Sequence, residues 1–170
     1  DDGLTDGMVQ NVAACRFDPA ALKCAGAKHE GCLSPAQIEA LTKAFAGPRD
    51  SAGQALYVGQ PWDPGIAAPG WRMWKLGTAD HGAPNAINTT LMAGALAFSS
   101  EYDTYRDASL AAFKARGGKL LIFHGSADGI FSALESVDYY QRLVTNNGGE
   151  AATAEWARLF LVPRTSPLSP

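Results

Sequence analysis

Two short apolar runs near the end of the 170-residue chain constrain its fold more than any other feature. The run Lys119–Phe123 has the length and composition of a buried parallel strand, and Arg158–Val162 is predicted to be the next strand. Between them, Ser132–Glu135 predicts a capping box, and apolar residues at helical spacing predict a helix over about 132–144. Strand, helix and strand in this order predict a right-handed βαβ crossover and therefore the α/β class.

One further helix is predicted in the first third of the chain. Ser34 can cap it, Pro35 suits the first helical position, and Gln37 can complete a capping box. Gly47 followed by proline ends the pattern, so the sequence predicts a helix over 35–46. The chain has 18 glycines and 10 prolines, and from residue 49 to 101 no period survives. We expect irregular, loop-rich structure there.

Composition excludes several classes of function. With 46% apolar residues the chain can bury one ordinary core. It has no run of roughly 18 apolar residues, so no membrane-spanning helix is predicted. The 14 basic and 17 acidic residues are scattered singly and give a net charge of −3. Nucleic acid is therefore not an expected partner.

The three cysteines indicate an oxidising compartment. Cys24 and Cys32 enclose a short loop that a disulfide can close with a gain of about 2–3 kcal/mol, which predicts a secreted or periplasmic protein. Cys15 is left over. Because the chain also begins at Asp1 rather than methionine, we expect a processed or truncated polypeptide.

The stretch His124–Asp128 is the leading candidate for chemistry, because it directly follows a predicted strand. An aspartate held there by a tight turn can orient a histidine from elsewhere and stabilise its imidazolium. Alternatively, Asp128 closes a turn or caps the next helix, and His124 is a hydrogen-bonded wall residue. No Gly-x-Ser-x-Gly elbow is present, so the chain shows no activated nucleophile.

Two other features have both a functional and an ordinary interpretation. Asp2 and Asp6 are each followed by glycine, so a sharp loop could turn carboxylate and carbonyl oxygens toward a hard cation; two Asp-Gly turns explain them equally simply. Trp62, Trp71 and Trp74 could form an aromatic ligand platform or could simply pack a loop-rich layer.

Several motifs in collinear order resemble the tannase and feruloyl esterase family of α/β-hydrolases. They include Asp-Asp-Gly-Leu-Thr-Asp-Gly-Met-Val at the start and Gly-Gly-Lys-Leu-Leu-Ile-Phe-His-Gly-Ser-Ala-Asp at 117–128. The other matching segments are 13–19, 32–37, 139–140 and 158–163. The resemblance implies a partial α/β-hydrolase core, a βαβ unit over 106–163, preceded by a loop-rich, mainly helical lid segment over 1–105. Residues 164–170 form an atypical tail, because the family's histidine-bearing segment is replaced there.

The resemblance also implies roles for individual residues. Asp128 matches the acid of a Ser-His-Asp triad. Asp2 and Asp6 match carboxylate ligands, and Leu4 and Met8 match carbonyl ligands, of a structural calcium ion. Cys24–Cys32 matches a disulfide of the lid, and Cys15 matches a cysteine whose partner lies upstream of this chain. Trp71 and Trp74 are candidate substrate contacts of the lid.

The function implied by the resemblance is serine-type hydrolysis of small esters of aromatic acids. Because the serine and histidine are missing, we expect this chain to need the remainder of the hydrolase chain and to be inactive alone. The alternative is a calcium-stabilised, secreted binding module for aromatic or carbohydrate ligands.

Overall fold

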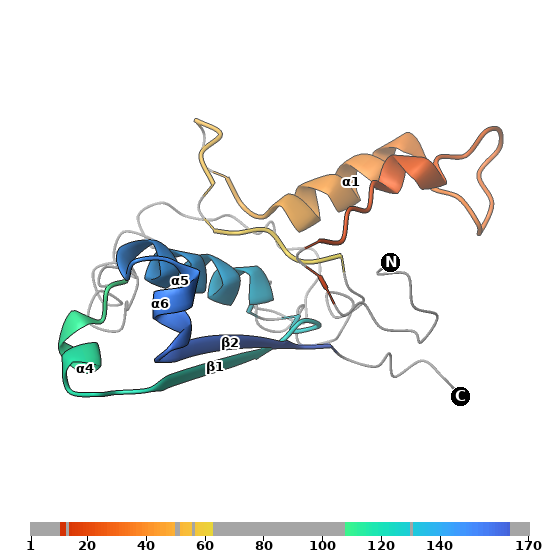
Figure 1. The fold of residues 1–170 in the computed structure, drawn as a ribbon. Coiled ribbons are helices and arrows are strands. Elements are labelled where there is room, and N and C mark those ends of the chain that lie inside the picture. Colours follow the sequence, from red (N-terminus) through yellow and green to blue (C-terminus); the bar gives the residue numbers. More distant parts are fainter. Residues whose placement is uncertain are drawn as a thin grey trace, which may run out of the picture.

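The computed structural model describes residues 11–12, 14–49, 52–55, 57–62, 108–129 and 131–163. The predicted boundary near residue 105 and the predicted tail 164–170 lie outside these ranges. Figure 1 shows two strands with helices on one side and a separate helix joined to them by an extended segment. The elements, in chain order, are η1 (Pro19–Leu22), α1 (Pro35–Ala46), α4 (Ala111–Ala115), β1 (Leu120–Gly125), α5 (Ala133–Asn146), α6 (Glu150–Ala154) and β2 (Ala157–Val162).

The predicted strand–helix–strand unit is confirmed. β1 and β2 pair in parallel, with Leu120 opposite Ala157 and Gly125 opposite Val162. α5 makes the crossover and lies along one side of the pair (Figure 1). The short helix α6, which was not predicted, follows Gly148 and Gly149, whose φ angles of 85° and 95° suit glycine.

The core of this unit lies between α5 and the strands. Leu143 is fully buried and packs with Trp156 and Ala157. Tyr140, also on α5, donates a hydrogen bond of 3.2 Å to the Ala157 carbonyl oxygen. Burial of a side chain such as Leu143 contributes about 1.5–3 kcal/mol. Apolar packing together with this bond therefore fixes α5 against β2.

The opposite face of the strand pair is open among the described residues. Side chains alternate along both strands, so every second one points away from α5. Phe123 is 74% exposed and Phe160, directly opposite, is 51% exposed; Leu121 and Val162 extend the same apolar surface. Parallel sheets are normally covered on both faces. The buried strand expected from the sequence is thus covered on one face only by described residues.

The predicted helix over 35–46 is confirmed as α1, together with its capping box. Gln37 N donates to Ser34 Oγ at 3.3 Å, and Ser34 N donates to Gln37 Oε1 at 2.9 Å. The helix ends at Gly47, whose φ angle of 80° is easily adopted only by glycine. Phe45, near that end, is buried and stacks on Trp62 with ring centroids 4.0 Å apart.

The start of α5 differs in detail from the predicted capping box. Ser132 is its N-cap, but Ser132 Oγ accepts from Leu134 N, while Glu135 N bonds to the Ser132 carbonyl oxygen. The Ser132 backbone instead forms a hydrogen bond with Tyr57. A long-range partner has therefore taken the place that the Glu135 side chain fills in a reciprocal capping box.

The predicted disulfide between Cys24 and Cys32 is present, with Cα atoms 5.0 Å apart. Two backbone hydrogen bonds flank it: Cys24 N donates to the Leu33 carbonyl oxygen at 3.0 Å, and Leu33 N donates to that of Leu22 at 2.7 Å. The disulfide thus closes a loop directly before α1. Among the described residues, no helix is long and apolar enough to cross a membrane.

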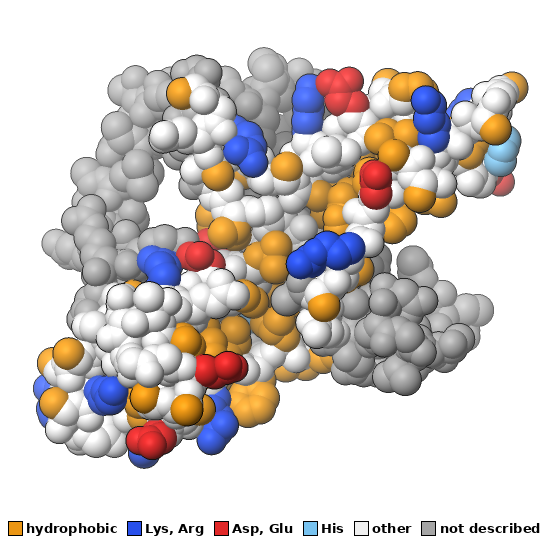
Figure 2. Space-filling view, turned by 45° about the horizontal axis from the view of Figure 1, so that its top comes forward, with side chains coloured by type: hydrophobic (Ala, Val, Ile, Leu, Met, Phe, Trp, Pro, Cys, Tyr) orange, Lys and Arg blue, Asp and Glu red, His pale blue; other side chains and the backbone are white. Residues whose placement is uncertain are grey.

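The segment 57–62 joins the two parts of the structure. Gln60 N donates to the Phe45 carbonyl oxygen at 2.9 Å, and the Gly59 carbonyl oxygen accepts from Ser132 Oγ at 2.5 Å. A Cβ atom on residue 59 would lie 2.5 Å from the Phe45 carbonyl oxygen. Figure 2 shows hydrophobic side chains gathered at the centre of the molecule, where these parts meet.

Replacement of Gly59 by alanine tests this close approach. The added Cβ would overlap the Phe45 carbonyl oxygen, so Gly59→Ala should lower the free energy of unfolding by about 1–3 kcal/mol. Gly26→Ala is the matched control, because a Cβ there meets nothing within 4 Å, and it should change stability by less than about 0.5 kcal/mol. Urea unfolding of both variants measures the difference, and equal stabilities would contradict the close packing.

Candidate active-site loop after β1

The loop that follows β1 is held at both ends. Ser126 N donates to the Val162 carbonyl oxygen at 3.0 Å, which extends the strand pairing into the loop. Asp128 N donates to the Gly125 carbonyl oxygen at 3.2 Å and closes a tight turn. Ser126 and Ala127 are 3% and 6% exposed. The carboxyl end of β1 thus presents Asp128 from a turn whose two central residues are buried.

The Asp128 carboxylate has a distinct contact at each oxygen. Oδ1 accepts a hydrogen bond of 2.9 Å from Phe131 N, and Oδ2 lies 3.7 Å from His124 Nε2. The aspartate therefore does close a turn, as one interpretation of the sequence expected. The helix cap is a different residue, Ser132. Because Phe131 N holds Oδ1 and the side chain is 35% exposed, the turn and a catalytic role are compatible.

His124 is a hydrogen-bonded wall residue, as the alternative interpretation expected. The strand alternation places it on the covered face of the sheet, where its side chain is 16% exposed. Its Nδ1 lies 2.7 Å from Ser136 Oγ in α5. The sequence reasoning missed Ser136, because a serine within a helix has no local signal that identifies a partner on a strand.

Tyr57 is a second residue that sequence reasoning missed at this loop. Burial raises the pKa of its hydroxyl group above the ordinary value, and the negative charges of Glu135 and Asp128 raise the pKa further. A hydrogen bond from the Ser132 backbone opposes part of this shift. Tyr57 thus remains a neutral phenol at neutral pH, and its pKa is raised by the charges of both carboxylates.

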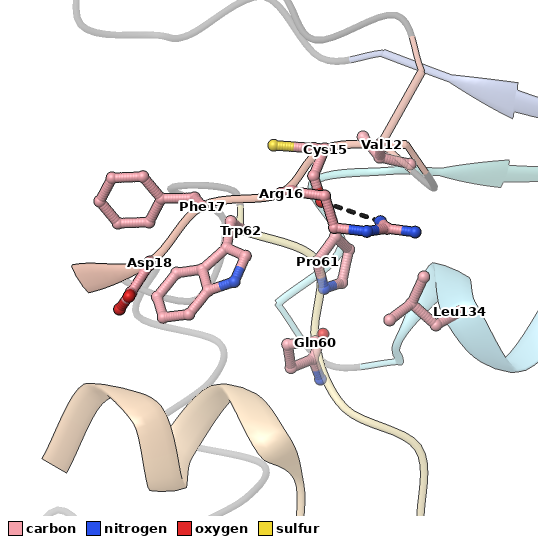
Figure 3. A pocket seen from close by; sticks show the side chains of 9 residues that line it. All are labelled: Val12, Cys15, Arg16, Phe17, Asp18, Gln60, Pro61, Trp62 and Leu134. Atoms are coloured by element: carbon pink, nitrogen blue, oxygen red, sulfur yellow. Dashed lines mark hydrogen bonds between the residues drawn. The ribbon is translucent and has the colours of Figure 1, made fainter. Parts of the chain in front are cut away.

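A pocket of about 420 Å³ lies beside the N-terminal turn of α5. Phe17 and Trp62 form an aromatic wall and Leu134 an aliphatic one, while the Arg16 guanidinium extends toward α5 and donates to the Cys15 carbonyl oxygen at 3.2 Å (Figure 3). The remaining lining residues are Val12, Cys15, Asp18, Gln60 and Pro61. The pocket combines apolar walls with one cationic side chain, Arg16, and one carboxylate, Asp18.

Trp62 serves mainly in packing. One face of its ring stacks on Phe45, and Phe17 meets it edge-on with centroids 5.3 Å apart. These contacts favour the packing interpretation of Trp62, although the half-buried side chain also lines the pocket. The other two tryptophans of the predicted platform, Trp71 and Trp74, lie outside the described residues.

The residues predicted to bind calcium also lie outside the described part of the chain; they are Asp2, Leu4, Asp6 and Met8. Within the described residues, no group of three or more His, Cys, Asp or Glu side chains is placed to hold a metal ion. Cys15 forms no disulfide within these ranges. Its predicted upstream partner is therefore still a prediction.

The solved structures that resemble this chain are esterases. It aligns with feruloyl esterase B from Aspergillus oryzae at a TM-score of 0.67 and 23% identity, covering 95% of this chain and 36% of that one. It aligns with the tannin acyl hydrolase of Aspergillus niger at a TM-score of 0.64 and 22% identity, covering 98% and 39% of the two chains. These similarities show the fold, and the parallel strand pair with α5 is part of an α/β-hydrolase core.

Sequence comparison leads to the same group of proteins. The chain is 36% identical to mono(2-hydroxyethyl) terephthalate hydrolase of Piscinibacter sakaiensis, covering 95% of this chain and 36% of that protein. It is 26% identical to a probable feruloyl esterase B-2 of Aspergillus flavus, covering 85% and 30% respectively. The chain thus spans about a third of the length of these relatives. A family model described as tannase and feruloyl esterase matches residues 1–98 and 76–166. The resemblance in the motifs is thereby confirmed, and the chain belongs to the tannase and feruloyl esterase family.

Proposed function

We propose that this chain supplies the acid of a serine-type carboxylic ester hydrolase, and that Asp128 is this acid. The observation that supports the proposal is the geometry of Asp128: it follows a parallel strand of an α/β-hydrolase core, its side chain is 35% exposed, and Oδ1 is held by Phe131 N. Carboxyl ends of parallel strands are where such folds gather functional groups.

In this mechanism a serine attacks the ester carbonyl carbon, a histidine takes the serine proton and later gives it to the leaving alcohol, and Asp128 orients that histidine. The serine and the histidine would come from the remainder of the hydrolase, outside the segments that match here. Asp128 does not accept the proton; its charge stabilises the imidazolium. The carboxylate is suited to this because Phe131 N fixes its orientation through Oδ1.

The substrates we propose are esters of aromatic acids. The names of the relatives refer to feruloyl, tannin acyl and terephthalate groups. The pocket beside α5 supports this choice, since Phe17 and Leu134 form apolar walls and Arg16 supplies one positive charge. Lid contacts from Trp71 and Trp74 belong to the same proposal. The disulfide Cys24–Cys32 supports a secreted or periplasmic location.

The remainder of the hydrolase is also the proposed partner of the open sheet face. Phe123 and Phe160 are neighbours across the strand pair and are both more than half exposed. An apolar surface of this kind is costly in water and typical of a sheet that another layer covers. The proposed triad and the proposed covering layer therefore require the same additional polypeptide.

The isolated 170-residue chain should not hydrolyse esters. With a chromogenic aryl ester, its rate is expected to equal that of buffer and that of its Asp128→Asn variant, because no attacking serine is supplied. Stopped assays at high protein concentration measure this. Turnover that disappears on Asp128→Asn would contradict the division of the triad between two parts of a hydrolase.

A chimera tests the role of Asp128 directly. Residues 108–163 of this chain would replace the aligned segment of feruloyl esterase B from Aspergillus oryzae. In an active chimera, Asp128→Asn should lower kcat by about 10⁴-fold, since the catalytic histidine loses its orienting charge. Asp138→Asn is the control, because this α5 carboxylate pairs with Arg142 on the surface. Equal effects of the two substitutions would overturn the assignment.

We also propose a structural calcium ion bound by Asp2 and Asp6 with the carbonyl groups of Leu4 and Met8. Saturating calcium should raise the melting temperature above that measured with chelator by about 5 °C or more, because a ligand that binds only the folded state stabilises it. The double variant Asp2→Asn, Asp6→Asn should lose this shift, whereas Asp138→Asn should retain it. A shift of equal size in the double variant would contradict the site.

A further inference from the structure

His124 lies on β1 and contacts two other parts of the unit: the crossover helix α5 and the loop after β1 that carries Asp128, called the acid loop below. It lies on the covered face of β1, and its two ring nitrogens face in different directions. Nδ1 is 2.7 Å from Ser136 Oγ on α5, a short hydrogen bond, and Nε2 is 3.7 Å from Asp128 Oδ2. A ring held at Nδ1 by the helix thus presents Nε2 toward the carboxylate.

The chemistry of the partners decides which nitrogen carries the proton. An ionised carboxylate only accepts hydrogen bonds, so the favourable ring form has the proton on Nε2, facing Asp128. Nδ1 is then an acceptor, and the Ser136 hydroxyl group can donate to it. The distance of 3.7 Å exceeds that of a direct hydrogen bond, but a bond dipole pointing at a charge this close is still attractive.

Both oxygens of Asp128 are then oriented by fixed donors. Oδ1 is fixed by Phe131 N at 2.9 Å. Oδ2 faces the His124 N–H, whose own position depends on Ser136. Among the described residues, Glu135 and Tyr57 are further ionisable groups whose charges bear on this loop, and Tyr57 carries no charge at neutral pH. Rotation of the carboxylate would therefore lose a contact at each oxygen.

We propose that His124, held by Ser136, is a positioning residue that sets the orientation of the Asp128 carboxylate. The proposal rests on the proposed function only in its consequence for catalysis, since the orientation itself is a property of this chain. His124 is not the histidine of the triad, because both its ring nitrogens are already used within the βα unit.

Ser136 is not a nucleophile, although serine, histidine and aspartate here lie in a row. It is the fourth residue of the regular helix α5, and its hydroxyl group faces the covered side of β1. A nucleophilic serine stands on a sharp turn where a substrate carbonyl can reach it. Ser136 instead buttresses the imidazole.

Two substitutions of His124 separate the proposed contact from simple packing. Glutamine places an amide nitrogen near the position of Nε2 and so keeps a donor for Asp128. Asparagine places its amide near the position of Nδ1 and so keeps only the partner of Ser136. If orientation through Nε2 matters, His124→Gln should behave like the unaltered chain and His124→Asn should not.

The first measurement uses the 170-residue chain and needs no activity. At about pH 8, where imidazole is ordinarily neutral, long-range ¹⁵N spectra should show the His124 proton on Nε2. Hydrogen exchange at the Phe131 amide, which reports the Asp128 contact, should be about fivefold faster in His124→Asn and unchanged in His124→Gln. A proton on Nδ1 in the unaltered chain, or equal exchange in both variants, would overturn the proposal.

The second measurement uses the active chimera. His124→Asn should lower kcat by about tenfold or more with little change in KM, because misorientation affects the transition state, whereas His124→Gln should restore most of kcat. Loss of activity to the same extent in both variants would show a packing role only. If Asp128→Asn has no effect on the chimera, the proposed function fails, and the spectra of the isolated chain still decide the orientation.

Discussion

The two hydrogen bonds of the Ser132 hydroxyl group hold the described parts of this molecule together. Its side chain is fully buried, and its hydroxyl group bonds in two directions: Oγ accepts from Leu134 N at 3.3 Å and donates to the Gly59 carbonyl oxygen at 2.5 Å. The first bond starts α5, and the second ties the segment from the first third of the chain to it. A buried hydroxyl group with both roles satisfied is costly to lose, because its partners would be left unpaired.

Ser132 also fixes one end of the acid loop. The loop begins where β1 ends at Gly125 and must reach the N-cap of α5 at Ser132, so Asp128 lies at the middle of a short connection with two fixed ends. Phe131 N bonds to the Asp128 carboxylate within that connection. The position of the carboxylate therefore follows from the packing of α5 on the strands and from the tether to Gly59.

Local patterns were sufficient to predict α1, α5 and the two strands, but not α6 and not the long-range partners of these elements. The capping box at Ser34 and Gln37 was predicted because both partners lie within four residues. At Ser132 the same kind of pattern predicted a box with Glu135, but Tyr57, from a distant part of the chain, bonds to the Ser132 backbone. The contact between His124 and Ser136 likewise depends on how α5 packs on β1, which hydrophobic periodicity does not specify.

The candidate site shows the same difference between what local patterns predict and what long-range packing decides. Asp128 could be proposed as the acid from its place after an apolar strand and from the family motif, because position in an α/β fold is encoded by the order of elements. His124, which contacts Asp128, comes from a strand face, and Tyr57, whose pKa the Asp128 charge raises, comes from a segment some seventy residues upstream.

Electrostatics explains why those two groups suit a catalytic acid. The loop carries Asp128, and Glu135 lies in the first turn of α5, so ionisation of Tyr57 would add a third negative charge near two others. Burial and these same carboxylates raise the pKa of Tyr57 and keep it neutral. On the other side, His124 offers a donor without requiring a full positive charge that would compete with the imidazolium for the carboxylate. His124 thus orients the proposed acid, and the neutral Tyr57 adds no charge near it, so the carboxylate charge stays available to the proposed histidine.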